Sequence, residues 1–289
     1  MVSMTALILD GAGLARRRQP MIAERAATVR TGRGYAPSFI LFAFGDEQGH
    51  APHVSRKQRM GVEAGVDLTP LIVPPRTQTG DAIARLRSLM ASRPFDGIFL
   101  QFPFPDAIDG DALADVVPVE LDVDIMTPVR MARYMNGTED LPPVTVSAAL
   151  LLLEDYDVSI EGRRGIVIAD DHPFSRMLHA ALVRRGADMG DLIDPAAPDL
   201  DMHVRAAELV VVSAATPGLV QATSIAPGAV AIDVGYFNPG GRGDIDLSGG
   251  IDHLAAICPV PGGIGPMTIS ALLERVVLFA ENAGRDIAG

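Results

Sequence analysis

The sequence contains no tryptophan, and aromatic residues make up only 5% of its 289 positions. Aliphatic side chains must therefore fill the core, and they are plentiful, because hydrophobic residues account for 48% of the chain. There is one cysteine, Cys258. A single cysteine excludes an intrachain disulfide and argues against a metal–thiolate cluster. We interpret Cys258 as a small buried hydrophobic residue.

Positive charge is also scarce. The 24 Lys and Arg residues face 36 Asp and Glu residues, for a formal net charge of −12. This balance argues against binding to the phosphates of nucleic acid. No stretch approaches the ~18 uncharged apolar residues of a membrane span, and the first residues lack the charged start of a secretion signal. These absences predict a soluble cytoplasmic protein with no nucleic-acid or membrane partner.

Lysine is the scarcest basic residue, because 23 of the 24 basic residues are arginines and only Lys57 is a lysine. A genome rich in G and C replaces lysine by arginine wherever either residue serves. Lys57 either survives by chance on a solvated face or is kept for chemistry. The second interpretation has a physical basis, since burial can lower the pKa of an amine toward neutral pH, whereas arginine stays protonated.

Strand-like and helix-like segments alternate along the chain, which predicts an α/β fold with mostly parallel strands. Two α/β lobes, joined near residues 143–149 and 259–266, fit this pattern. Strands are expected at residues 38–44, 67–73, 96–101, 165–169, 208–213 and 229–234. Helices are expected at residues 53–65, 79–92, 147–156 and 267–283, and a turn at residues 238–243.

The segment HAPHVSRKQRM places His50, His53 and Lys57 at spacings of three and four residues. Side chains at these spacings share one face of a helix. Two histidines suggest a metal site, but no third ligand is implied nearby, and we expect no metal. Spacing alone leaves open both a solvated polar face and a catalytic cluster.

Polar residues also lie within or at the end of two apolar stretches. Gln101 ends GIFLQ, at the carboxyl end of an expected strand, where open α/β sheets place ligand-contacting residues. Its amide offers a donor and an acceptor, although a glutamine there also serves as a plain surface cap. In ELDVDIMTP, Asp122 and Asp124 alternate with apolar residues. Because unpaired buried acids are costly, these two are either exposed at a strand edge or held for binding.

The second lobe contains a loop of unusual composition, CPVPGGIGPMT. Between Pro261 and Pro266 every residue except Ile264 is Gly or Pro. The backbone of such a rigid loop can approach a ligand closely. Thr268 is expected near the cap of the following helix, whose N-terminus suits an anionic group. A simple tight turn fits the same composition.

Over nearly its whole length the chain resembles the FolD-type bifunctional methylenetetrahydrofolate dehydrogenase/methenyltetrahydrofolate cyclohydrolase family, as a divergent member. Its sole lysine falls at the catalytic lysine of that family. The segments that carry the resemblance are ILDG (8–11), HVSRKQRMGVEAGV (53–66), GIFLQFPFP (97–105), DVDIMTP (122–128), GAVAIDVG (228–235) and PVPGGIGPMT (259–268).

The resemblance implies two domains with a folate cleft between them. One is an α/β folate and catalytic domain of residues 1–146 plus a C-terminal helix at 267–289. The other is a Rossmann-like nucleotide domain of residues 147–266, with a doubly wound parallel sheet. Members of the family are usually dimers, so the resemblance also implies a homodimer with a small-molecule folate substrate.

The resemblance further implies roles for individual residues. Lys57 would transfer protons at the one-carbon unit, Gln101 would hydrogen-bond Lys57, and Asp124 would bind the amino-bearing edge of the pterin. His53 stands where the family has a tyrosine near the lysine, and it would stack on the pterin or relay a proton. The remaining implied contacts are Pro261, Gly262 and Gly263 to substrate, and Thr145, Asp170, Gly235, Tyr236 and Thr268 to the cofactor NADP or NAD.

Several positions depart from the family pattern. The G-F-H of the acidic motif is Ile125-Met126-Thr127, and the glycine of a later A-V-G-K is Ala215. The nucleotide loop G-R-S-x-x-V-G-x-P is ADDHPFSRM at 169–177, without glycine and with an acid in place of the arginine. Acids there would repel a phosphate. These changes predict weak or absent NADP binding, with NAD as an option if Asp170 or Asp194 contacts a ribose hydroxyl.

The sequence therefore predicts an enzyme that interconverts methylene-, methenyl- and 10-formyltetrahydrofolate, with the cyclohydrolase step best supported and the dehydrogenase step in doubt. A close variant is a specialised paralogue that acts beside a separate dehydrogenase. The alternative from another class is a non-catalytic folate-binding or regulatory paralogue. Retention of Lys57, Gln101 and Asp124 together favours an enzyme, because a binder has little use for the lysine.

Overall fold

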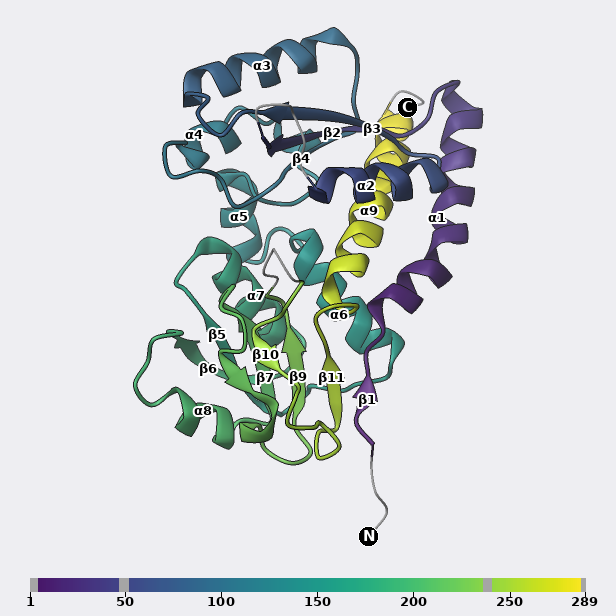
Figure 1. Cartoon of the computed structure of the whole chain (residues 1–289). Helices are drawn as coiled ribbons and strands as arrows, with labels where there is room; N and C mark the ends of the chain where they lie inside the picture. The colour runs from purple at the N-terminus through teal and green to yellow at the C-terminus, as the bar shows by residue number, and fades with distance from the viewer. Residues whose placement is uncertain (1–4, 47–51, 236–240, 287–289) are drawn as a thin grey trace. The chain divides into compact units, whose positions relative to one another are not determined.

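The computed structural model describes residues 5–46, 52–235 and 241–286. The chain forms two compact units, each made of two chain segments. Unit 1 comprises Met1–Arg16 and Thr145–Thr268, and unit 2 comprises Arg17–Val144 and Ile269–Gly289. The chain passes from one unit to the other within or at the start of three helices (Figure 1): α1 (Gly11–Arg33), α6 (Val144–Asp155) and α9 (Ile264–Asp286).

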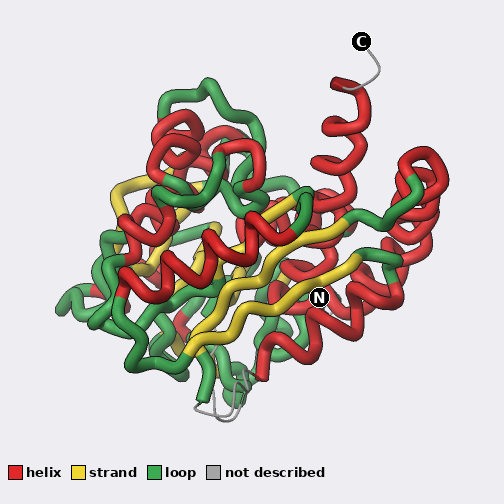
Figure 2. The backbone as a smooth tube through the Cα atoms, turned by 90° about the horizontal axis from the view of Figure 1, so that it is seen from above, coloured by secondary structure: helices red, strands yellow, loops and turns green. Residues whose placement is uncertain are grey.

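Unit 2 is built on a three-stranded parallel sheet in the order β3-β2-β4. Figure 2 shows yellow strands running side by side with red helices along them. The central strand, SFILFAF, is buried at all but its last residue. A continuous apolar run of this kind is typical of a parallel strand that is covered on both faces. The strands are β2 (Ser38–Phe44), β3 (Asp67–Val73) and β4 (Gly97–Leu100).

Helices connect these strands and close the core of unit 2. Helix α2 (Pro52–Glu63) follows β2, and α3 (Thr79–Ser92) follows β3. Ala82 and Leu86 of α3 pack in one cluster with Phe42 and Ile98 of the sheet. Three short helices then follow β4: α4 (Gly110–Ala114), the 3-10 helix η1 (Val119–Leu121) and α5 (Pro128–Met135).

Ion pairs join the parts of α1 and α9 that belong to unit 2. Arg25 lies 3.2 Å from Glu274 and 2.9 Å from Glu281, and Arg18 lies 2.5 Å from Glu274. These side chains are partly exposed, so the network adds modestly to stability. Its main effect is to fix which faces of the two helices meet.

Unit 1 contains a six-stranded sheet in the order β1-β11-β9-β7-β5-β6, with every neighbouring pair parallel. Strand β1 comes first in the chain and lies at one edge. From β5 the chain adds β6 on one side and then turns to add β7, β9 and β11 on the other. That reversal is the topological switch point at which open α/β sheets bind ligands. The strands are β5 (Arg164–Ala169), β6 (Asp188–Ile193), β7 (Leu209–Ser213), β9 (Val230–Asp233), β11 (Ala256–Cys258) and β1 (Leu7–Ile8).

Smaller elements complete unit 1. Helix α7 (Pro173–Arg184) follows β5, and α8 (Leu200–Ala206) follows β6. A second, two-stranded parallel sheet pairs β8 (Val220–Gln221) with β10 (Ile245–Asp246), and η2 (Ala222–Ser224) continues from β8. None of the helices described for this chain is both long enough and apolar enough to cross a membrane.

The predicted α/β class with parallel sheets is confirmed, and so are most of the expected elements. The strands at 38–44 and 67–73 and the helix at 79–92 match β2, β3 and α3 residue for residue. Helix α1 was not predicted, because Pro20 lies inside it and it contains many arginines. Proline removes a helix hydrogen bond, so this segment lacks the usual helix pattern. Residues 238–240 of the expected turn lie outside the described residues.

Residues 5–16 lie in unit 1, where Leu7 and Ile8 pair with Ala256 and Ile257 of β11. The last helix begins at Ile264, not near residue 267. Thr268 is therefore inside the helix and not near its cap.

The loop after β7 contains a strained alanine. Ala215 has a φ of 50°, in the left-handed region that favours glycine. Its N–H donates to Asp244 Oδ2 at 3.1 Å, and this bond, with those of its two neighbours, holds the conformation. The backbone of Ala215 is therefore strained.

Ala215→Gly is expected to raise the free energy of unfolding by about 1 kcal/mol. A left-handed alanine costs about 1–2 kcal/mol, and the freer unfolded chain of glycine takes back about 0.4–1 kcal/mol. Denaturant titration measures the change. The neighbouring Ala214→Gly is the control, since its backbone lies outside the left-handed region, and it is expected to lose stability. Equal losses in both variants would disprove strain at Ala215.

Candidate functional site

Lys57 and Gln101 meet in unit 2. Lys57 projects from α2, the helix after β2, and Gln101 directly follows β4, so both come from the carboxyl-terminal side of neighbouring parallel strands. Lys57 Nζ donates to Gln101 Oε1 at 2.6 Å, and Gln101 Nε2 donates to the carbonyl of Phe102 at 2.9 Å. The second bond fixes which way the amide points, so its oxygen faces the amine.

The amine of Lys57 is buried, with 7% of the residue exposed. Burial lowers the pKa of Lys57 from its ordinary 10.5 to about 8, with the charge of Asp124 acting to raise it and that of Arg56 to lower it. The ring of Phe99 lies 5.5 Å from Nζ and supplies part of the apolar surroundings. Gln101 is a neutral acceptor, so it orients the amine without holding its proton. Lys57 therefore exchanges protons near neutral pH.

Asp122 organises the loop that carries Asp124. An isolated parallel bridge joins Ile98 to Asp122. The carboxylate of Asp122 accepts four hydrogen bonds, at 2.8 to 3.2 Å: three from the N–H groups of Asp124, Met126 and Thr127, and one from the Thr127 hydroxyl. This buried acid is thus satisfied by its own loop, and its role is structural.

The loop bends sharply at Ile125, whose φ is 63°. A β-branched residue rarely adopts this conformation, and the residue is fully buried. It occupies a position where the family pattern has glycine. The bonds to Asp122 span this residue and hold the strained turn.

Asp124 itself is 9% exposed. Its Oδ1 accepts the N–H of Val144 at 2.8 Å. Burial raises the pKa of Asp124 to about 7, against the lowering effects of the Val144 hydrogen bond, Arg275 and Lys57; Asp122 raises it further. The Asp124 carboxylate therefore changes charge near neutral pH, just below the range in which Lys57 does. An amine and a carboxyl group tuned in this way are typical of an acid–base site.

Histidines 50 and 53 cannot be placed at this site. His50 lies outside the described residues, and so does the side chain of His53, although its backbone belongs to α2. Among the described residues, no three His, Cys, Asp or Glu side chains gather in a way that suits a metal ion.

The loop of Pro261, Gly262 and Gly263 belongs to unit 1. The carbonyl of Gly262 accepts the N–H of Ala12 at 2.8 Å. A Cβ on Gly263 would lie 2.4 Å from Cys258 Sγ, and a Cβ on Gly11 would lie 1.9 Å from the carbonyl oxygen of Gly263. Glycine is required at both positions because the backbones pack directly on each other. Thr268 follows in α9, where its hydroxyl donates to the carbonyl of Ile264 at 3.1 Å.

The loop between β5 and α7 is closed by its own side chains. His172 is the N-cap of α7, and its Nδ1 accepts the N–H of Phe174 at 3.2 Å. Pro173 offers no N–H at all. Asp171 forms an exposed two-point ion pair with Arg176, at 2.6 and 2.7 Å, and Asp170 is exposed beside it. A phosphate at this helix N-terminus would meet two exposed carboxylates, and the N–H of Phe174 is already bonded, so the loop fits a dinucleotide diphosphate poorly.

Two buried acids hold the neighbouring loops of unit 1. Asp244 accepts the N–H groups of Ala214, Ala215 and Thr216 at 2.6 to 3.1 Å. Asp233 accepts those of Gly235, Asp244 and Ile245 at 2.9 to 3.1 Å. Burial raises the pKa of both carboxyl groups, that of Asp233 to about 7.

The other expected cofactor contacts are Gly235, Thr145 and Tyr236. A Cβ on Gly235 would lie 2.0 Å from Asp244 Oδ2, so glycine is required there by packing. Thr145 is half-buried in the first turn of α6. Tyr236 lies outside the described residues.

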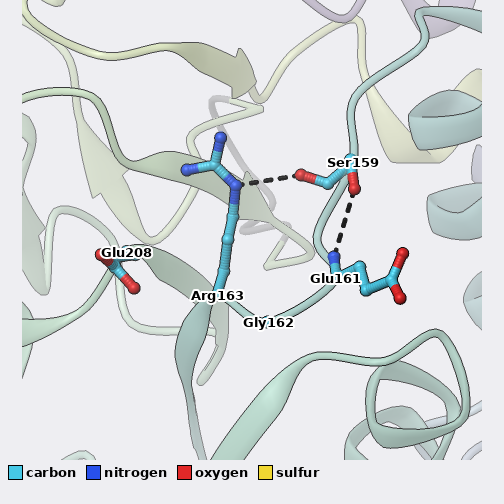
Figure 3. A pocket seen from close by; sticks show the side chains of 5 residues that line it. All are labelled: Ser159, Glu161, Gly162, Arg163 and Glu208. Atoms are coloured by element: carbon cyan, nitrogen blue, oxygen red, sulfur yellow. Dashed lines mark hydrogen bonds between the residues drawn. The ribbon is translucent and has the colours of Figure 1, made fainter.

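A surface hollow of about 410 Å³ lies elsewhere in unit 1 (Figure 3). Arg163 and Glu208 directly precede β5 and β7, so it lies at the amino ends of the strands, opposite to the edge at which such sheets bind ligands. Arg163 Nε donates to the carbonyl of Ser159 at 2.9 Å. We assign the hollow no function. Its lining residues are Ser159, Glu161, Gly162, Arg163 and Glu208.

Comparison with known proteins matches both parts of the chain. Residues 9–124 match the family described as tetrahydrofolate dehydrogenase/cyclohydrolase, catalytic domain, and residues 143–284 match its NAD(P)-binding domain. The chain is 35% identical to "Bifunctional protein FolD 2" of Frankia casuarinae over 282 residues, covering 97% of this chain and 98% of the relative. It is 32% identical to "Bifunctional protein FolD" of Saccharophagus degradans over 278 residues, covering 96% and 99%.

Among solved structures, the chain is similar to the methylenetetrahydrofolate dehydrogenase-cyclohydrolase (FolD) of Trypanosoma brucei, which was crystallised with NADP and an inhibitor. The TM-score is 0.89 at 26% identity, with 97% of this chain and 99% of that chain covered. The bifunctional FolD of Campylobacter jejuni gives a TM-score of 0.87 at 25% identity, with 96% and 100% covered.

The single lysine makes the pKa of Lys57 directly measurable. Protein labelled with ¹³C at the lysine ε-carbon is expected to give one lysine signal that titrates with a midpoint near 8, not 10.5. Asp124→Asn is expected to move the midpoint down, because the charge of Asp124 raises the pKa of Lys57, and Arg56→Gln to move it up. A midpoint above 10, or opposite shifts in the two variants, would contradict the described environment.

Proposed function

Because the chain belongs to the tetrahydrofolate dehydrogenase/cyclohydrolase family, we propose that it interconverts methylene-, methenyl- and 10-formyltetrahydrofolate, with the cyclohydrolase step as its main activity. The observation that carries this proposal is the buried amine of Lys57, which donates to Gln101 Oε1 at 2.6 Å and has a pKa near 8. A site of this kind supplies a base at neutral pH without a metal or a cofactor.

In the proposed mechanism, water adds to the methenyl carbon and Lys57 takes the proton that the water loses. The carbon–N5 bond then breaks as N5 receives a proton and the new hydroxyl group loses one, which forms the C=O bond and leaves the formyl group on N10. Overall one water is consumed and one proton is released. Gln101 accepts one N–H of the amine, and this bond fixes the orientation of the other positions on Nζ. Asp124, when ionised, accepts hydrogen bonds from the amino-bearing edge of the pterin.

The dehydrogenase step is proposed to be weak or lost. Its hydride acceptor would be NADP or NAD, yet the loop of Asp170, Asp171 and His172 fits the diphosphate poorly, as its geometry above indicates. Of the two cofactors NAD suits the chain better. Asp194 directly follows β6, the position from which an acidic residue contacts a ribose hydroxyl in dinucleotide-binding folds.

A non-catalytic folate-binding or regulatory paralogue is the second candidate. The altered nucleotide loop favours it. The cost of burying Lys57 argues against it, because a binder gains nothing from an amine whose charged form is destabilised. We also propose a cytoplasmic homodimer, as in the family, which light scattering of the purified protein tests.

Lys57→Met is expected to reduce the rate at which methenyltetrahydrofolate absorbance falls without nucleotide by about 10²–10⁴-fold, the usual contribution of a general base. In the wild type, kcat/KM is expected to rise with pH and level off above about 8, because the neutral amine is the active form. Arg59→Met is the matched control, since Arg59 lies exposed on the same helix. Equal rates for the wild type and Lys57→Met, after subtraction of the uncatalysed reaction, would leave the binder as the better proposal.

Asp171→Asn is expected to raise the affinity for NADP about two- to fivefold, the range set by an exposed ion pair. The change removes a negative charge and releases Arg176 to face a phosphate. Equilibrium binding measures the effect, with NAD as the comparison ligand. The double variant Asp171→Asn with Arg176→Gln should lose the gain. If Asp171→Asn leaves NADP binding unchanged, repulsion at this loop is not what limits it.

A further inference from the structure

Two buried arginines flank the loop that carries Asp124. Arg130 comes from α5 and Arg275 from α9, and they are 7% and 6% exposed. Burying a guanidinium group is costly unless its donors and its charge are satisfied. The contacts of the two arginines therefore indicate what each one does.

Arg130 is held by an acid. Its Nε donates to Glu139 Oε2 at 2.9 Å, its Nη2 donates to the same oxygen, and its Nη1 donates to the carbonyl of Asp122 at 2.8 Å. Phe279 of α9 lies over the guanidinium at 5.4 Å. These contacts make Arg130 one half of a buried ion pair that anchors α5.

Arg275 contacts the backbone on both sides of Asp124. Its Nη1 donates to the carbonyl of Val123 at 3.4 Å, and its Nη2 donates to the carbonyl of Pro142 at 3.1 Å. Val123 directly precedes Asp124, and Pro142 stands two residues before Val144. The guanidinium group of Arg275 thus contacts both of the chain segments that the hydrogen bond from the Val144 N–H to Asp124 Oδ1 joins.

We propose that Arg275 is a positioning residue for Asp124: it holds the backbone at Val123 and at Pro142 and places a positive charge near the carboxylate that receives the pterin. The pterin part rests on the proposed function. The charge and geometry part does not, since it concerns the protein alone.

The surroundings of Asp124 determine in which direction Arg275 moves its pKa. Facing it are Lys57 from α2, Arg275 from α9, Asp122 from its own loop, and the N–H of Val144 from α6. Burial and Asp122 raise the pKa of Asp124, and the N–H and the two cations lower it. Arg130 and Glu139 act in turn on Arg275. Loss of the Arg275 charge therefore raises the pKa of Asp124 above about 7 and leaves the carboxyl group protonated at neutral pH.

The first test is the titration of the Asp124 carboxyl carbon by ¹³C NMR in the free protein, assigned by the signal missing in Asp124→Asn. Arg275→Gln is expected to raise the midpoint by about one unit, and Arg275→Lys to leave it near the wild-type value because the charge is kept. Arg130→Gln is the control: it removes a buried arginine of the same region, and it is expected to lower thermal stability without moving the midpoint.

The second test separates binding from chemistry in the cyclohydrolase assay. At pH 7, Arg275→Gln is expected to raise KM about fivefold, because a rise of about one unit from a pKa of about 7 lowers the ionised fraction of Asp124 from about one half to about one tenth. The value of kcat should change much less, and KM should recover as pH rises. Arg275→Lys is expected to raise KM at every pH, because a lysine cannot span both carbonyls. If Arg275→Gln does not fold, the KM of Arg275→Lys decides the positioning role.

The proposal is overturned if Arg275→Gln keeps the wild-type midpoint, if Arg130→Gln shifts it equally, or if Arg275→Lys keeps the wild-type KM. If the wild type turns over no folate but Arg275→Gln shows the expected NMR shift, the proposed function is wrong and the electrostatic role of Arg275 is retained.

Discussion

The chemistry of unit 2 depends on burying the amine of Lys57 without placing a carboxylate in direct contact with it. Burial destabilises the ammonium form of Lys57, and a carboxylate in direct contact would restore it. The structure places a neutral amide, Gln101, in contact with Nζ and lets Asp124 act through its charge from further away. The result is a pKa near 8. An arginine in the same place would stay charged.

The same balance governs Asp124. Burial pushes the pKa of its carboxyl group up, while one backbone N–H and two cations pull it down to about 7. The loop that achieves this is itself costly, because Ile125 adopts a conformation that favours glycine. Asp122 offsets that cost by accepting four hydrogen bonds from the loop. Strain and buried charge therefore concentrate in one short segment, as they often do at functional sites.

The sequence predicts elements and site residues to different degrees. Apolar runs bounded by glycine and proline located β2, β3 and β4 well, and the motif matches pointed to Lys57, Gln101 and Asp124 together. Helix α1 was missed because its residues are stabilised by distant partners, such as Glu274 and Glu281, and not by a local pattern. Arg275 was missed for the same reason: its partners lie 133 and 152 residues away, and an arginine inside a helix is ordinarily a surface residue. Only the fold brings a charge from α9 next to Asp124.

The two units differ in what their buried acids do. In unit 1, Asp233 and Asp244 bind the N–H groups of the loops after β7 and β9, and His172 caps α7. These loops are ordered by the protein's own side chains, so the unit needs no nucleotide to hold its shape. The N–H group at Phe174 cannot be capped by His172 and bind a phosphate at once. A chain that lost cofactor binding could therefore keep unit 1 as a scaffold. Unit 2 keeps a buried base beside a buried acid, an arrangement that costs stability and that suits proton transfer at Lys57 and substrate binding at Asp124. This contrast favours an enzyme with one strong step over a passive binder.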